Sequence, residues 1–269
     1  MRVTFLYALL LISSFATAQS GRYAMGARQA AMAGTSVTLA DQWAVFNNPG
    51  ALGNHTGDQV FVSYQNRYGL AELSQFGVGY VRDFGKPVLG VGFYRFGGDL
   101  FNEQRVNLAA AHKLDRVSLG VSVDYLQYAI ATVGSRGVFV LDFGGVADLT
   151  EQIRFGAHIF NLSQTKLVKE TGERIPTVMK AGLAFTPIDE LTFQVETEKD
   201  LDFDEVYRIG LEYRIIERVH LRTGFSTAPF NGAFGFGLYP KKFQFEYAFV
   251  GSAELGAIHE LSVSYDLTK

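Results

Sequence analysis

Histidines are the residues of this 269-residue chain best suited to acid–base or metal chemistry: His55, His112, His158, His220 and His259. No two of them have the spacing of HExxH or of another common ligand pair. The chain has no Cys, which excludes disulfides, thiolate metal sites and cysteine nucleophiles. His158 or His220 could lie beside a Ser or Asp as in a hydrolase, but many such residues occur, so proximity is expected by chance. The sequence therefore predicts no enzyme, no catalytic residue, no metal site and no cofactor.

Charged residues recur at every second position of many segments, opposite faces of Phe, Tyr, Leu, Val and Ile. A tight turn near Glu217 would place Glu212 opposite Arg222 on the neighbouring segment, and Gly210 opposite Gly224. Such an opposite-charge pair stabilises a sheet by a fraction of a kcal/mol and avoids an unpaired charge in a confined space. The predicted polar network consists of Arg105, Asp124, Arg154, Lys180, Glu196, Arg208, Glu212, Arg222 and Glu246.

Strands must position these charges, because apolar and polar residues alternate with period two from Val60 onward. We count about fourteen segments, and predict an all-β fold: an antiparallel transmembrane β-barrel over residues 57–269. A soluble β-sandwich has the same period. Tight connections (near residues 84–85, 115, 150–151, 189, 217 and 240–241) alternate with longer ones (near 66–72, 97–102, 129–136, 162–176, 199–204 and 250–256), and this favours the barrel. In its lumen the network could be a ligand-contacting channel or, as we favour, a salt-bridged filling.

The N-terminus has the layout of an export signal. Met1-Arg2 is basic, residues 3–12 are apolar, and Ala16-Thr17-Ala18 is a small-x-small cleavage site, so we expect a signal peptide at residues 1–18. The apolar run is shorter than the roughly 20 residues that a spanning helix needs. The net charge of −3 lacks the basic excess of a nucleic-acid-binding protein. We expect a multi-pass protein of the bacterial outer membrane that contacts its lipid and no nucleic acid.

Residues 19–56 are predicted to form an N-terminal hatch, or plug, inside the barrel. The stretch from Gly26 to Gly34 is rich in small residues, which let backbone pack closely, and Asn48-Pro49-Gly50 is a turn signal. A periplasmic linker is the alternative, although the apolar content and the single Trp43 disfavour it. The residues predicted to hold or gate the plug are Gly26, Gly34, Asp41, Trp43, Asn47, Asn48 and Pro49.

The segment from Gly26 to Leu52 combines a Gly/Ala-rich opening, Ala40-Asp41 and Asn48-Pro49-Gly50-Ala51-Leu52 ahead of the first strand. In this it resembles the FadL-like outer-membrane barrels, including the PorV/PorQ branch of Bacteroidota type IX secretion. The resemblance implies a barrel of about 14 strands with an N-terminal hatch. It also implies one of two functions: the transporter branch passes hydrophobic compounds such as fatty acids, and the PorV-like branch partners a secretion translocon. The chain departs from both branches in its short length and brief outer loops.

The leading hypothesis is transport of hydrophobic small molecules across the outer membrane through a plug-gated lumen. The alternative is a non-transporting barrel that serves type IX secretion or another cell-envelope complex. A hydrophobic small molecule and a secretion or envelope protein are therefore the expected partners beside lipid.

Overall fold

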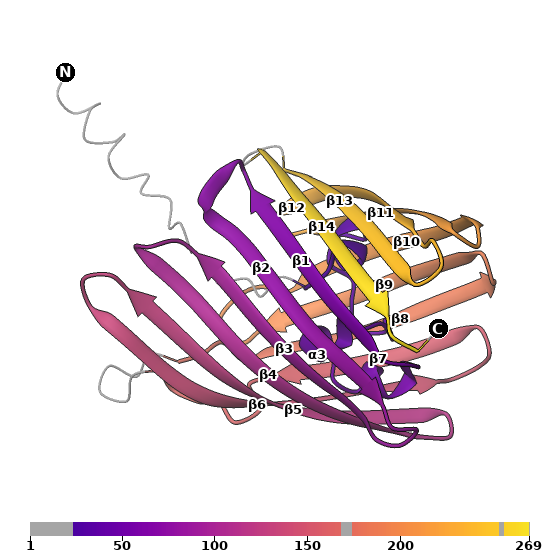
Figure 1. The fold of residues 1–269 in the computed structure, drawn as a ribbon, viewed down its shortest axis with the longest axis horizontal. Helices are drawn as coiled ribbons and strands as arrows, with labels where there is room; N and C mark the ends of the chain where they lie inside the picture. The colour runs from indigo at the N-terminus through magenta and orange to yellow at the C-terminus, as the bar shows by residue number, and fades with distance from the viewer. Residues whose placement is uncertain (1–23, 168–173, 253–255, 269) are drawn as a thin grey trace, which may run out of the picture.

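The computed structural model describes residues 24–167, 174–252 and 256–268. The predicted signal peptide lies outside these residues. Fourteen antiparallel strands form one closed barrel in which each strand pairs with its sequence neighbours and β1 pairs with β14. Figure 1 shows this ring, with the indigo N-terminal segment enclosed by the strands.

The strands are β1 (Gln59–Arg67), β2 (Leu70–Asp83), β3 (Val88–Gly97), β4 (Phe101–Leu114), β5 (Val117–Ile130), β6 (Gly134–Asp148), β7 (Ile153–Phe160), β8 (Val178–Ile188), β9 (Leu191–Asp200), β10 (Val206–Ile216), β11 (Val219–Thr227), β12 (Phe230–Leu238), β13 (Phe243–Ser252) and β14 (Gly256–Asp266). The prediction of an antiparallel barrel of about 14 strands is confirmed.

Period-two alternation determines which side chains face the interior. In β5, Leu119, Val121 and Val123 are exposed on the outer face, whereas Ser122 and Asp124 are buried inside. The predicted register is also confirmed, since Glu212 pairs with Arg222 and Gly210 with Gly224 across β10 and β11. The outer face of the barrel is therefore apolar, whereas the inner face combines polar side chains with an apolar patch that includes Phe61, Val81 and Val88.

The connections at the end where the chain enters β1 and leaves β14 are tight, as predicted, and we call this end the turn end. At the opposite end, the loop end, the expectation of longer loops is partly wrong. Only Tyr68 and Gly69 separate β1 from β2, and only residues 98–100 separate β3 from β4. The hairpins continue their ladders further than the apolar alternation indicated, because backbone pairing does not need an apolar face.

The plug segment, which we define as residues 24–56, carries α2 (Ala27–Ala31), α3 (Ala44–Asn47) and the 3-10 turn η1 (Ala51–Asn54). α2 contacts β11 to β14, while α3 and η1 contact β3 to β6. The segment thus crosses the interior from one wall to the other. In the part of the chain that the structure describes, no helix is long and apolar enough to span a membrane.

Candidate functional site

Glycines on the inner face of the barrel make room for the plug segment. A Cβ added at Gly120 on β5 would lie 2.3 Å from the carbonyl oxygen of Pro49, and one at Gly156 on β7 would lie 2.5 Å from that of Val37. Similar close approaches occur at Gly77, Gly92, Gly144, Gly182, Gly210, Gly224 and Gly235. These glycines are spread around the barrel, so the plug segment lies close to the backbone of the wall over most of the circumference.

Side-chain amides join distant parts of the plug segment. Asn47 accepts a hydrogen bond from the Met25 backbone N–H (2.8 Å) and donates one to the Met25 carbonyl (2.9 Å). Asn48 donates to the Val37 carbonyl (2.6 Å) and accepts from the Gly50 N–H (3.0 Å). Buried amides in such arrangements satisfy backbone groups that helices and sheets would otherwise pair.

Carboxylates and hydroxyls on the barrel wall bind backbone N–H groups of the plug segment. Glu196 on β9 accepts from the N–H groups of Ser36 (2.7 Å) and Val37 (2.8 Å). Glu260 on β14 accepts from the Gly26 N–H at 3.0 Å. Hydrogen bonds to charged acceptors are about twice as strong as neutral ones, so these contacts fix the path of the segment.

An apolar cluster holds the centre of the plug segment. Trp43 is fully buried and packs edge-on against Phe61 of β1, with the ring centroids 4.7 Å apart. Gly26 has a φ of +104°, and a Cβ there would lie 2.7 Å from the Trp43 ring, so both the backbone and the contact require glycine. Gly34 has a φ of +88°, and a Cβ added there would lie 3.2 Å from Nε of Arg208.

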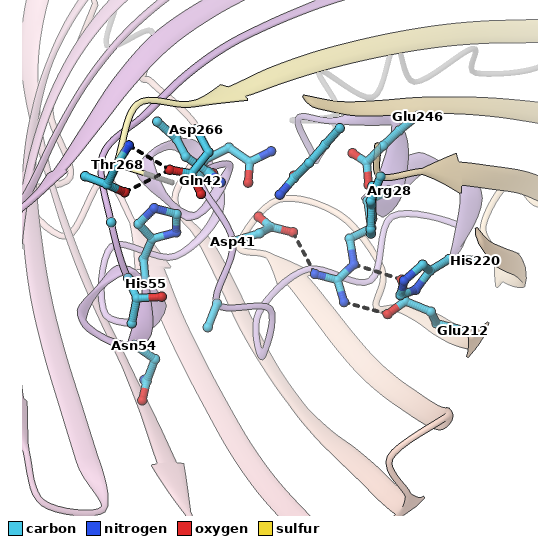
Figure 2. Close-up of a pocket in the computed structure, with 16 residues that line it drawn as sticks. Arg28, Asp41, Gln42, Asn54, His55, Glu212, His220, Glu246, Asp266 and Thr268 are labelled. Atoms are coloured by element: carbon cyan, nitrogen blue, oxygen red, sulfur yellow. Dashed lines mark hydrogen bonds and ion pairs between the residues drawn. The ribbon is translucent and has the colours of Figure 1, made fainter. Parts of the chain in front are cut away.

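Charged residues at the turn end form a network between α2 and the strands (Figure 2). Arg28 donates two hydrogen bonds to Glu212 (2.7 and 2.9 Å) and one to Asp41 (3.2 Å). Arg222 bonds to Glu212 at 2.5 Å and lies 3.2 Å from Glu246. Removal of one partner of a buried ion pair strongly destabilises the folded protein, because the other charge is left buried and unpaired. The plug segment is therefore coupled to β10, β11 and β13 by charge.

Two further charge groups lie nearer the loop end. Arg105 pairs with Asp124 and, at 3.1 Å, with Asp142. On the neighbouring strands β8, β9 and β10, Glu198 pairs with Lys180 (3.2 Å) and Arg208 (3.1 Å). All these side chains face the interior and are nearly buried. Because each charge has an oppositely charged partner, the two groups are largely neutral overall.

The predicted network divides into these three groups, and Arg154 joins none of them. It pairs with Asp148 at 2.7 Å near the end of its hairpin and is about one-third exposed. The predicted network leaves out Arg28, Asp142, Tyr239 and Glu260, and it leaves out Glu198 although the alternation places Glu198 on the inward face. Tyr239 belongs to the turn-end group, because its hydroxyl donates to Glu246 at 2.7 Å. The inward parity of Asp142 and Glu260 was a usable signal for those two. Nothing in the alternation indicated Arg28 or Tyr239, because both lie outside the strands.

Two cavities lie on opposite sides of α2. The turn-end cavity, of about 480 Å³, is polar and is lined by Arg28 and by residues of the turn end. The loop-end cavity is smaller, about 90 Å³, and its walls combine apolar side chains with polar ones: Ala30, Ala33, Val250 and Ile258 on the one hand, and Gln65, Glu198, Arg208, Ser226 and Asn231 on the other. α2 contributes Arg28 to one cavity and Ala30 to the other. This short helix is thus the element that separates them.

No protein-family model matches the sequence, and no curated protein matches it. Solved structures do share its fold. The CymD monoaromatic hydrocarbon channel has a TM-score of 0.73 at 14% identity, over 91% of this chain and 98% of that one. The toluene transporter TodX of Pseudomonas putida has a TM-score of 0.69 at 13% identity, over 91% and 99% of the two chains.

A Pseudomonas aeruginosa FadL homologue has a TM-score of 0.66 at 11% identity, over 90% of this chain and 98% of that chain. CymD is a channel and TodX a transporter, and at such identities the likeness of all three to this chain is one of fold. The PorV/PorQ branch and the roles of the predicted plug and network residues stay predictions. The chain has a closed 14-strand antiparallel barrel and shares this fold with CymD, TodX and the FadL homologue.

Proposed function

We propose that the protein is an outer-membrane transporter of hydrophobic small molecules whose plug segment is the gate. Its outer face is a band of apolar side chains, as a barrel in lipid requires, and its backbone is paired around the closed ring. The neighbours whose fold it shares include a toluene transporter and a monoaromatic hydrocarbon channel. Outer-membrane barrels have short turns on the periplasmic side and longer loops outside, so the turn end would face the periplasm and the loop end the outside.

The position of α2 between the two cavities is the observation that carries the proposal. A molecule that enters the loop-end cavity meets Ala30 of α2, and passage beyond it requires that this helix move. Three contacts resist the movement. They are the ion pair of Arg28 with Glu212 and the hydrogen bonds from the backbone N–H groups of Gly26 to Glu260 and of Ala27 to Ser262. Opening is then a local rearrangement of the first part of the plug segment.

A reversible cross-link tests the gate. Ala27, the first residue of α2, donates its backbone N–H to Ser262 on β14 at 2.7 Å, so an Ala27→Cys/Ser262→Cys pair places two thiols between the moving helix and the wall in a chain that otherwise has none. Cells that express this variant are treated with a short thiol-cleavable bifunctional reagent, and accumulation of labelled toluene is measured. We expect the cross-link to reduce accumulation to the level of cells without the protein, and reduction to restore it.

Each single-cysteine variant, treated with the same reagent, is the matched control. Faster migration of unboiled than of boiled protein on detergent gels verifies the folded barrel. If the cross-linked barrel accumulates toluene as fast as the reduced one, the plug segment is not the gate.

A second function, the accessory barrel of a secretion or envelope complex, is favoured by one observation. The plug segment contacts most of the inner wall, and the inner charges are paired, as in a permanently closed barrel. Native mass spectrometry of the gently extracted protein separates the two functions. A retained apolar molecule supports transport, whereas a stoichiometric protein partner on an empty barrel supports the accessory role.

A further inference from the structure

The turn-end cavity has a chemistry that transport of hydrocarbons does not explain. It measures about 480 Å³, within the usual range of small-molecule sites. Figure 2 shows its two sides: Arg28, Asp41 and Glu212 on one, and His55, Asp266 and Thr268 on the other. Apolar side chains are nearly absent from the described residues that line it. An apolar ligand would thus bury polar groups here without partners.

The cavity carries an excess of negative charge. Its lining includes four carboxylates, those of Asp41, Glu212, Glu246 and Asp266, but only one guanidinium, that of Arg28. Arg222 lies behind the lining and pairs with Glu212 and Glu246, which still leaves more carboxylates than cations. Negative charge in a confined cavity is stabilised when a cation enters.

Buried acceptor atoms provide an independent observation. The side chains of His55 and Gln59 are only 7% and 5% exposed, and both line the cavity. Within the described part of the chain, His55 Nε2 and Gln59 Oε1 have no hydrogen-bond partner, and neither has Asn54 Oδ1. Unsatisfied buried polar atoms are uncommon, and several beside one cavity indicate a ligand or water that supplies the missing hydrogen bonds.

These groups do not converge as metal ligands do. Among the described residues, no three His, Asp or Glu side chains lie together in a way that could hold a metal ion. The unpartnered acceptors lie on one side of the cavity with Asp266, and Glu212 and Glu246 lie on the other, so a molecule with several N–H donors fits these groups better than a single ion. We propose that the turn-end cavity binds an organic cation through an ammonium or guanidinium group. The group comes either from a free small amine or from a Lys or Arg side chain of another protein.

Isothermal titration of the full-length protein in detergent tests this binding. Butylguanidinium is the probe, and butylurea, its neutral isostere, is the matched ligand control. We expect butylguanidinium to bind at least about tenfold more tightly than butylurea, since hydrogen bonds to a charged group are worth more than neutral ones. A blocked pentapeptide with one central arginine, compared with the same peptide carrying citrulline, tests the protein source.

Two variants locate the site. Asp266→Asn removes a charge while it keeps an oxygen that can accept from Thr268, and Gln59→Met removes an unpartnered acceptor at similar volume. Each should weaken butylguanidinium binding by about tenfold. Glu205→Gln makes the same charge change in an exposed loop, where Glu205 pairs with Lys199, and should leave binding unchanged.

The outcomes separate clearly. If both the peptide and butylguanidinium bind, the cation chemistry is supported, and tighter binding of the peptide identifies a protein source. If butylguanidinium binds no better than butylurea, the proposal is overturned. The same holds if heat-modifiable Asp266→Asn and Gln59→Met barrels bind it like the wild type. Failure here leaves the gate proposal intact, because the toluene assay does not involve this cavity's ligand.

Discussion

The side chain of Asn47 and the backbone of Met25 form a reciprocal pair of hydrogen bonds, one accepted from the Met25 N–H and one donated to its carbonyl. The geometry copies one rung of a β-ladder, although Asn47 lies in a helix and Met25 in an irregular stretch. Its effect is to fasten the start of the plug segment to the end of α3. The gate proposed above therefore opens only when this pair breaks or when both residues move together.

We expect Asn47→Ala to loosen the start of the plug segment while the barrel stays closed. Loss of the amide leaves two buried backbone groups of Met25 without partners, at a local cost of about 1–3 kcal/mol. Hydrogen exchange with mass spectrometry should show faster exchange of residues 24–31. Asn102→Ala, which removes a 3.4 Å bond to Gly98 at the loop end, is the control. Equal protection of residues 24–31 in both variants would contradict the expectation.

Glu196→Gln should release the middle of the plug segment. The carboxylate accepts from two successive N–H groups, and the neutral amide oxygen is a weaker acceptor, so we expect a local loss of about 1–3 kcal/mol. Hydrogen exchange with mass spectrometry should show faster exchange of residues 34–40 than in the wild type. Glu190→Gln removes an equal charge from a turn where Glu190 pairs with Arg214, and exchange of residues 34–40 in this variant should match the wild type. Unchanged exchange in the Glu196 variant would show that the wall does not hold this stretch.

Gly120→Ala should destabilise the closed arrangement through a steric clash. The added Cβ meets the backbone of Pro49 and Gly50, which cannot rotate away, so we expect a cost of about 1–3 kcal/mol. Gly232→Ala is a matched control, because its Cβ would have only the Phe225 ring near it, at 3.8 Å. Urea unfolding followed by tryptophan fluorescence reports on the event, since Trp43 is the single Trp. Coincident unfolding curves for the two variants would refute the predicted clash.

Acid should weaken the end of the plug segment at His55. Burial lowers the pKa of His55 from its ordinary value of 6.5, although Asp83, Asp266 and Asp58 oppose this shift. A histidine with a lowered folded-state pKa stabilises the closed form above about pH 6.5, and this stabilisation is lost as the pH falls toward the lowered value. We expect hydrogen exchange of residues 54–57, corrected for intrinsic rates, to increase between about pH 7.5 and 5.5. In His55→Asn the increase should be smaller, and an equal increase would exclude His55 as the cause.

The sequence was sufficient for relationships that depend on neighbouring strands. The pairing of Glu212 with Arg222 followed from one turn and a period of two, and the structure has that register. It was insufficient where residues meet across the interior. Arg28 reaches Glu212 over 184 positions, which depends on the path of the plug segment and on closure of the ring, and neither leaves a local signal. Some predicted loop lengths were wrong for a related reason, because paired backbone can extend beyond the apolar alternation that marked the strands.

The plug segment also bridges the two ends of the sheet. It binds β14 through Gly26, Ala27 and Gln42, and it continues directly into β1, the partner of β14. While the sheet is still open, these contacts shorten the chain between its two free edges from about two hundred residues to fewer than about twenty. By the logarithmic dependence of loop closure on length, this lowers the entropic cost of closure by roughly 2 kcal/mol. The contacts of the plug segment with β14 are thus placed to favour pairing of β14 with β1 when the ring closes.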